Sequence, residues 1–358
     1  MSPKSRAARA SILCVALTAS GCLGSGSAEC ADLDAQLRYY AEKAARYPTA
    51  DGVHVQLAGV YLRKASESHD PALLAQARAS LARAEAIQNS YEAMRLRVQI
   101  ASFTHRFGEV LELAARAERA SPYERRDPQL DAFRVDAYLG LGEPERAGRL
   151  LPLGQRPADF HTAAALGRFL AARARPEEAA QSFGVAAEIA REAEEPTLAA
   201  WAEVMAAGVW IDAGAPARAH PHLSAAARLD PGSRELRIHR AELAARDGRP
   251  AEALHGFEAL LAEAEDPLVA HRAFLAARAL GREAAAQRHY ATAERLLRRV
   301  IDAGEVYTLG ALAQLHADAG VRLAEALALA QRNLTFKRDA EARATLAAVQ
   351  ARLAEAKR

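Results

Sequence analysis

Small and large apolar residues recur at a fixed helical spacing from the middle of the chain onward. An alanine is followed four positions later by a large apolar residue and, in most sets, three positions after that by a second small one. Residues three and four apart share one face of an α-helix, so each set marks a helix with an apolar stripe that can lie close to a neighbour. The sets are Ala179, Phe183 and Ala186; Ala219, Leu223 and Ala226; Ala253 and Phe257; and Ala286, Tyr290 and Ala293.

Each of these sets is preceded by another apolar segment, and turn residues separate that segment from the set. Leu166, Gly167 and Leu170 precede the first set, and Ala207 and Trp210 precede the second. Glycine suits the left-handed conformation that reverses a chain between helices, and proline stops a helix before the next one begins. The pattern therefore predicts antiparallel helical hairpins. The predicted turn glycines are Gly214, Gly248, Gly281 and Gly320, and the predicted stops are Pro122, Pro231 and Pro267.

The period of this pattern resembles the tetratricopeptide repeat. Ala253 follows Ala219 by 34 residues, and Ala286 follows Ala253 by 33, whereas the tetratricopeptide unit is two antiparallel helices of about 34 residues. The resemblance implies an all-α, right-handed superhelical solenoid of antiparallel helix pairs, with about seven or eight units in residues 31–338. Residues 339–358 are expected to form a capping helix with a polar outer face, as an open-ended solenoid needs.

The amino-terminal units fit this pattern less well. Residues 57–61 predict a first helix and residues 77–84 its partner, with an insertion from Lys64 to Pro71 that we expect to be a longer turn. Residues 110–117 predict another second helix, whereas residues 90–105 fit a first helix poorly. The unit that begins around Tyr138 is expected to end early, in a loop from Pro152 to Ala158.

Composition agrees with closely packed helices. The apolar fraction is 51%, but aromatic residues supply only 6%, and alanine is the best helix former. The 47 basic and 45 acidic residues nearly cancel and are interspersed. Because no basic block or arginine–aromatic stripe occurs, a nucleic-acid partner is not indicated.

The amino terminus predicts export. Lys4, Arg6 and Arg9 precede a short apolar run from Ala10 to Ala19, which is the order of charges and apolar residues in a secretory signal. The run is too short to span a bilayer as a mature helix. Residues 19–22, Ala-Ser-Gly-Cys, resemble the lipobox of bacterial lipoproteins, although the family usually has leucine at the first position. This resemblance implies a signal peptide at 1–21, lipidation of Cys22, a flexible tether at 22–30 and an outer-membrane lipoprotein facing the periplasm.

Ordinary signal-peptidase cleavage after Ala28 remains the alternative. The chain has three cysteines, of which Cys14 lies in the signal and Cys22 and Cys30 in the leader. The remaining sequence contains none, so no disulfide framework and no thiolate metal site is predicted there.

No catalytic motif is found. The sequence has no H-E-x-x-H, no G-x-S-x-G and no phosphate-binding G-x4-G-K-[ST] motif. Carboxylates stand beside arginines at helical spacing, which is typical of solvated helix faces. The 11 histidines are spread over successive hairpins. We therefore predict neither an enzyme nor a cofactor nor a metal site.

The predicted binding surface is the concave face, which first helices line in solenoids of this type. Charges of both signs with one tryptophan suit an extended peptide or a partner helix. The expected function is a non-catalytic periplasmic scaffold or adaptor for unknown protein or peptide partners in an envelope assembly, held at the membrane by its lipid. A soluble periplasmic regulator or small-ligand binder is the alternative. The candidate groove residues are His161, Arg168, Trp201, Asp212, Glu235, Glu242, Arg246, His271, Arg272 and Arg278.

Overall fold

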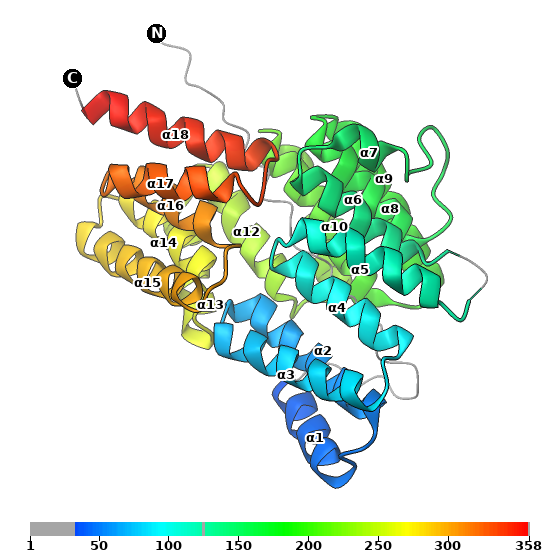
Figure 1. The fold of residues 1–358 in the computed structure, drawn as a ribbon. Helices are drawn as coiled ribbons and strands as arrows, with labels where there is room; N and C mark the ends of the chain where they lie inside the picture. Colours follow the sequence, from blue (N-terminus) through cyan, green and yellow to red (C-terminus); the bar gives the residue numbers. More distant parts are fainter. Residues whose placement is uncertain (1–32, 124–125, 357–358) are drawn as a thin grey trace.

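The computed structural model describes residues 33–123 and 126–356, and every regular element among them is a helix. Within these residues, helix α1 is followed by eight antiparallel helix pairs and by a final helix, α18 (Figure 1). The structure thus confirms the predicted all-α array, its number of units and its terminal helix. The helices are α1 (Leu33–Arg46); the pairs α2 (Asp51–Ser68) and α3 (Pro71–Ile87), α4 (Tyr91–Phe103) and α5 (Phe107–Ala120), α6 (Pro128–Gly140) and α7 (Pro144–Gly148), α8 (Phe160–Ala172) and α9 (Pro176–Glu192), α10 (Pro196–Asp212) and α11 (His220–Leu229), α12 (Arg234–Arg246) and α13 (Pro250–Glu263), α14 (Pro267–Ala279) and α15 (Glu283–Asp302), α16 (Leu309–Ala319) and α17 (Leu323–Asn333); and α18 (Ala340–Ala356).

Neighbouring units share one continuous core. The second helix of each pair contacts the first helix of the next pair throughout the array. First helices also contact one another along α2, α4, α6 and α8, and again along α10, α12, α14 and α16. Because a single hairpin cannot bury both of its apolar faces, this stacking supplies most of the stability.

Alanines occupy the helix crossings, as predicted. Ala219 and Ala253 are fully buried, and Ala286 is 2% exposed. Gly167 of α8 is tighter still, since a Cβ there would lie 2.8 Å from the ring of Phe183. The small side chains therefore set how closely the helices approach one another.

The predicted turn glycines have the left-handed conformation. Gly214 has φ 72°, and the amide of the next residue, Ala215, donates to the carbonyl of Trp210 at 2.9 Å. This bond closes a Schellman-type helix end, which favours glycine at the left-handed position. Ala174 takes the same conformation without glycine, at φ 55°. The other predicted turn glycines, Gly248, Gly281 and Gly320, have φ between 67° and 77°.

The expected long turn between Lys64 and Pro71 is wrong. Helix α2 continues to Ser68, and only His69 and Asp70 connect it to α3. No glycine or proline interrupts residues 64–70, so nothing stops the helix before Pro71. The early end of the unit that begins around Tyr138 is confirmed, because α7 has only five residues before the loop.

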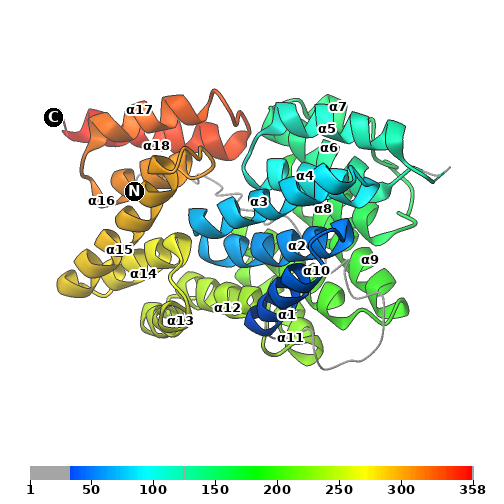
Figure 2. The same cartoon turned by 60° about the horizontal axis from the view of Figure 1, so that its bottom comes forward.

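The ends of the array meet, whereas an open-ended solenoid was expected. Figures 1 and 2 show α2 and α3 lying between the α4–α6 region and the α12–α14 region. Arg78 of α3 pairs with Glu305 of the α15–α16 loop. At the other end, the amide of Arg338, just before α18, donates to the carbonyl of Gly140 in α6 at 2.6 Å. These contacts close the array.

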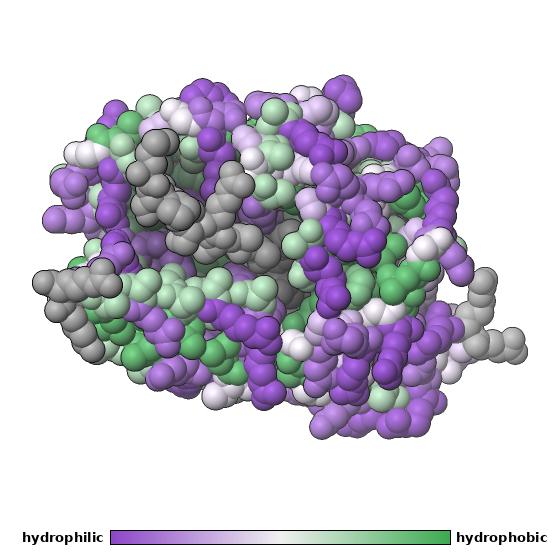
Figure 3. Space-filling view, turned by 90° about the horizontal axis from the view of Figure 1, so that it is seen from above, coloured by the Kyte–Doolittle hydropathy of each residue, from purple (hydrophilic) through white to green (hydrophobic). Residues whose placement is uncertain are grey.

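Helix α18 packs against α16 and α17, but its outer face is less polar than expected. Ala340, Ala347 and Ala351 are exposed there among Arg343 and Gln350. On the face of the molecule seen in Figure 3, hydrophilic and apolar residues are interspersed, and a pale green row of weakly apolar side chains lies along one side. Within the described part of the chain, no helix combines the length and apolarity needed to cross a membrane.

Candidate functional site

The ten residues predicted to line a groove lie on the first helices α8, α10, α12 and α14. They do not form one continuous row. Half of them form a hydrogen bond or ion pair with another helix, and these pairs fall into separate clusters.

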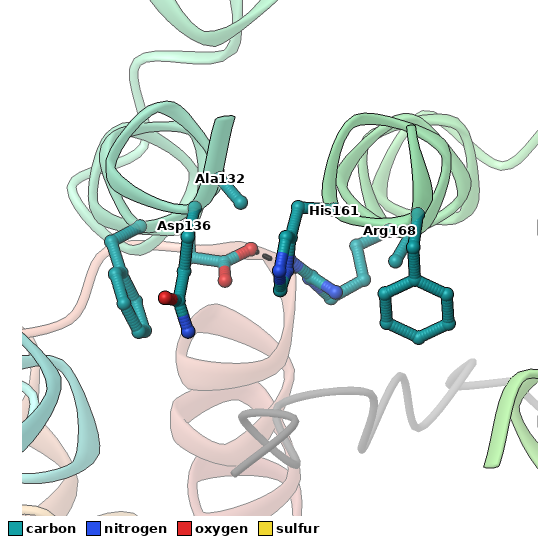
Figure 4. Close-up of a pocket in the computed structure, with 8 residues that line it drawn as sticks. Ala132, Asp136, His161 and Arg168 are labelled. Atoms are coloured by element: carbon teal, nitrogen blue, oxygen red, sulfur yellow. Dashed lines mark hydrogen bonds and ion pairs between the residues drawn. The ribbon is translucent and has the colours of Figure 1, made fainter. Parts of the chain in front are cut away.

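The first cluster joins α6 and α8. Arg168 Nε donates to Asp136 Oδ1 at 2.7 Å, and both side chains are buried. Figure 4 shows the two side chains pointing toward one another, with His161 beside them. Burial raises the pKa of Asp136, although Arg168 opposes this change. The recess that these residues line has a volume of about 20 Å³, which is room for about one water molecule.

The second cluster, which we name the carboxylate–arginine cluster, consists of Asp212, Glu242, Arg246 and Arg272. Glu242 of α12 forms an ion pair with Arg272 of α14. Burial alone would raise the pKa of Glu242, but Arg272, His239 and Arg246 together lower it. The cluster therefore holds a stable charge pair that links two neighbouring units.

Asp212, at the end of α10, behaves differently from Glu242. Its carboxyl is half-buried, and no hydrogen bond or ion pair within 4 Å joins it to another side chain among the described residues. Burial, reinforced by the nearby Glu242, raises the pKa of Asp212 to about 7 despite Arg246 and Arg272. This carboxyl is the group in the cluster that gains or loses a proton near neutral pH.

Charges on helices far away in the sequence also interact with this face of the first helices. Glu341 of α18 acts on Asp212, and Glu235 of α12 acts on Glu67 of α2. This face of the first helices therefore looks into the middle of the array, toward its two ends. Arg246 is exposed at the edge of the cluster, which leaves a cation accessible there.

His239 supports the same cluster from α12. Its Nδ1 lies 2.9 Å from the carbonyl of Glu235, and because a carbonyl only accepts, Nδ1 carries the proton. The Nε2 atom is 4.0 Å from Glu242. A Cβ on Gly208 of α10 would lie 3.1 Å from His239 Nε2, so that glycine leaves room for the ring.

The third cluster joins α14 to α16. His271 Nε2 and Asp318 Oδ2 are 2.9 Å apart, and Gln314 Nε2 donates to the other carboxylate oxygen at 2.9 Å. Arg278 donates to the backbone carbonyl of Asp318. His271 and Arg278 thus tie α14 to α16, and Arg278 remains exposed.

Trp201 was expected to be exposed in the groove, but it is partly buried. Its ring lies 5.8 Å from Phe160 and 6.1 Å from Phe183, between centroids. It packs against two clusters of buried residues that meet at α8–α10. Trp201 therefore contributes to the core that joins these units.

Sequence reasoning missed the partners of the predicted residues. No local pattern singles out Asp136, because Asp131 and Arg134 also stand among the apolar residues of positions 130–139. Asp318, Glu341 and Glu67 come from other units, and no local pattern indicates their approach. Within residues 33–123 and 126–356, no three His, Cys, Asp or Glu side chains converge as a metal site would require.

Comparisons with known proteins concern the fold. No protein-family model matches the chain, and no curated protein matches it. Among solved structures, the chain is similar to the human IFIT1 dimer with PPP-AAAA, at 16% identity and TM-score 0.44, over 84% of this chain and 71% of that one. It is similar to a tetratricopeptide repeat protein from Parabacteroides merdae, at 13% identity and TM-score 0.43, over 73% and 98%. It is also similar to PilF from Pseudomonas aeruginosa, at 16% identity and TM-score 0.33, over 69% and 91%.

Proposed function

We propose that the protein is a non-catalytic scaffold that holds a protein or peptide partner against the carboxylate–arginine cluster. The observation that carries this proposal is the convergence of both charge signs from three consecutive units on one face, with Arg246 accessible. Side chains from separate units can each contact a different part of an extended partner peptide that lies along the array. The partner segment then carries at least one carboxylate for Arg246.

The internal ion pairs shape how such a partner binds. Glu242 and Arg272 already satisfy one another, so a partner that competes for them gains little. Arg246 and the titrating Asp212 are the members that remain available for new contacts. Partner binding is therefore expected to depend on salt and on pH near neutrality, where Asp212 changes charge.

We also propose that the scaffold is exported and lipid-anchored. The support is the signal-like segment and the lipobox-like residues 19–22, which lie outside the described residues. The first described residue, Leu33, follows Cys22 by eleven positions. An extended tether of that length spans at most about 35 to 40 Å, so the array would stay close to the outer membrane on its periplasmic side.

The small-ligand alternative has less support. The recess at α6–α8 measures about 20 Å³, and a second recess between α3, α4 and α5 measures about 170 Å³. Pockets for small molecules usually measure about 300 Å³ or more.

A pull-down from detergent-solubilised envelopes tests the binding proposal. The wild-type chain and the Arg246→Glu variant serve as baits, and proteins that only the wild type retains are candidate partners. The matched control is Arg228→Glu, which reverses the charge of another exposed arginine, on the second helix α11. Retention by the wild type and the control, with loss in Arg246→Glu, supports the proposal. Equal retention by Arg246→Glu would place the binding surface elsewhere.

A further inference from the structure

Two histidines and a tyrosine lie where the two ends of the array meet. His69 connects α2 to α3, His105 connects α4 to α5, and Tyr307 belongs to the α15–α16 loop. The ring of His69 lies 5.9 Å from Tyr307 and 6.1 Å from Phe103, and His105 lies 6.2 Å from Tyr307. We name the contact formed by His69, Phe103, His105 and Tyr307 the seam. It joins segments that are about 200 residues apart.

An ion pair flanks the rings of the seam. Nη1 of Arg78 donates to Oε1 of Glu305, and Nη2 donates to Oε2. The Glu305 side chain is only 4% exposed, whereas Arg78 is 37% exposed. Glu305 therefore depends on this single partner from the other end of the array, because a buried carboxylate without a partner is costly.

Three polar atoms of the seam rings have no hydrogen-bond partner in the described part of the chain. His69 Nδ1, His105 Nδ1 and the Tyr307 hydroxyl are buried, and none has a hydrogen-bond partner among the described residues. A neutral imidazole can leave one nitrogen bare as an acceptor, whereas an imidazolium has two N–H donors and a charge. Protonation of either ring would bury an unpaired donor, which the closed seam cannot accommodate.

Burial and the neighbouring charges together shift the pKa values of the three ring groups in the directions that keep them uncharged. Burial lowers the pKa of His69; Arg272 and Arg234 add to this effect, and Asp266 opposes it. Burial also lowers the pKa of His105, and Lys337 and His69 add to this. Around Tyr307, burial raises the pKa of the phenol; Glu305 and Asp70 add to this, and Arg78 opposes it. The phenol therefore stays neutral while the histidines titrate.

We propose that the seam is an acid-sensitive latch that closes the array while His69 and His105 are neutral and releases its two ends when they are protonated. In the open form both rings reach water and regain a pKa of about 6.5. The open form then binds more protons than the closed form, so the closed form loses stability as the pH falls below that value. One pH unit lower, opening becomes up to about tenfold more favourable for each histidine. The latch stands on the geometry of the seam, independently of the proposed partner site.

Hydrogen–deuterium exchange of the full-length protein in detergent, at pH 7.5 and 5.5, tests the latch. Exchange rates are corrected for the intrinsic effect of pH on amides. Peptides covering His69, His105 and Tyr307 should exchange at least about tenfold faster at pH 5.5, relative to peptides from α9, which contains no histidine. If the ratio of exchange rates between the seam peptides and the reference peptides is the same at both pH values, the proposal is overturned.

Replacement of both histidines separates titration from general loosening. His69→Asn with His105→Asn removes the titrating rings, and asparagine tolerates the left-handed backbone found at both positions (φ 53° and 56°). This variant should exchange at the seam with no extra acid response. The control is His255→Asn on the exposed side of α13, which should respond as the wild type does. A wild-type acid response in the double variant would also reject the latch, and circular dichroism verifies that each variant is folded.

Discussion

At the scale of single residues, Asp212 is the group whose charge the fold controls most directly. Its pKa in the folded protein is about 7, above the value of about 3.9 in an unfolded chain. At a pH between these two values, the carboxyl of Asp212 is ionised in the unfolded chain but protonated in the folded protein. Stability is therefore lost as the pH rises from about 4 to 7 and then stays level.

Asp212→Asn should remove this loss. We expect it to raise the free energy of unfolding by about 1–3 kcal/mol at pH 8 and to leave it nearly unchanged at pH 4. Urea unfolding of both proteins at pH 4, 6 and 8 measures the difference. Asp302→Asn, at an exposed position at the end of α15, is the control and should show no such trend. If the difference in the free energy of unfolding between the variant and the wild type does not grow with pH, the role given to Asp212 is contradicted.

The residue scale also shows where sequence reasoning succeeds and fails. The buried alanines at positions 219, 253 and 286 could be predicted, because a helical period identifies the face on which a residue lies. Trp201 could not be placed, because its burial depends on Phe160 and Phe183 of the preceding unit. Periodicity indicates a face, but it does not indicate what the next unit places against that face.

At the scale of elements, the helix ends follow local chemistry closely. Side chains of Asp70, Ser90 and Asp159 accept backbone N–H groups at the starts of α3, α4 and α8, as N-cap residues do. Short-range rules predicted most turns for this reason. The exception was α2, where length alone suggested an insertion although no helix breaker was present.

Two substitutions at equivalent turns should have opposite effects. Gly214 and Ala174 both have a left-handed backbone, and a Cβ at Gly214 would meet no atom within 4 Å. Gly214→Ala should therefore lower stability by about 1 kcal/mol through backbone strain alone. Ala174→Gly relieves that strain and should raise stability by a similar amount, less the entropy of glycine in the unfolded chain. Urea unfolding at one pH compares them, and changes of the same sign would contradict this account of the turns.

At the scale of the whole molecule, closure of the array was the feature that the sequence could not predict. The repeat pattern indicates how each unit stacks on the next, but small changes in angle accumulate over eight units. The total angle between the first and last units decides whether Arg78 meets Glu305 and whether Arg338 meets Gly140. One continuous groove was expected along the first helices, and separate clusters of side chains are found, several of them paired with other helices.

The membrane anchor is tested by Cys22→Ala. Wild-type protein should incorporate labelled palmitate and sediment with membranes, and the variant should do neither. Intact mass separates the two maturation routes, because lipidation gives a modified amino terminus at Cys22 and ordinary cleavage gives a free one at Glu29. A wild-type chain that begins at Glu29 and carries no lipid would refute the anchor.

The central claim is that a partner is held on the face of the first helices that looks into the array. The most direct measurement is photo-cross-linking in living cells, with a photoreactive amino acid in place of Arg246 on α12 or of Arg228 on α11. Both arginines are exposed, so the two positions differ in the face they occupy and not in access to solvent. We predict a cross-linked protein adduct from position 246 and none from position 228. An adduct from position 228, with none from position 246, would contradict the account.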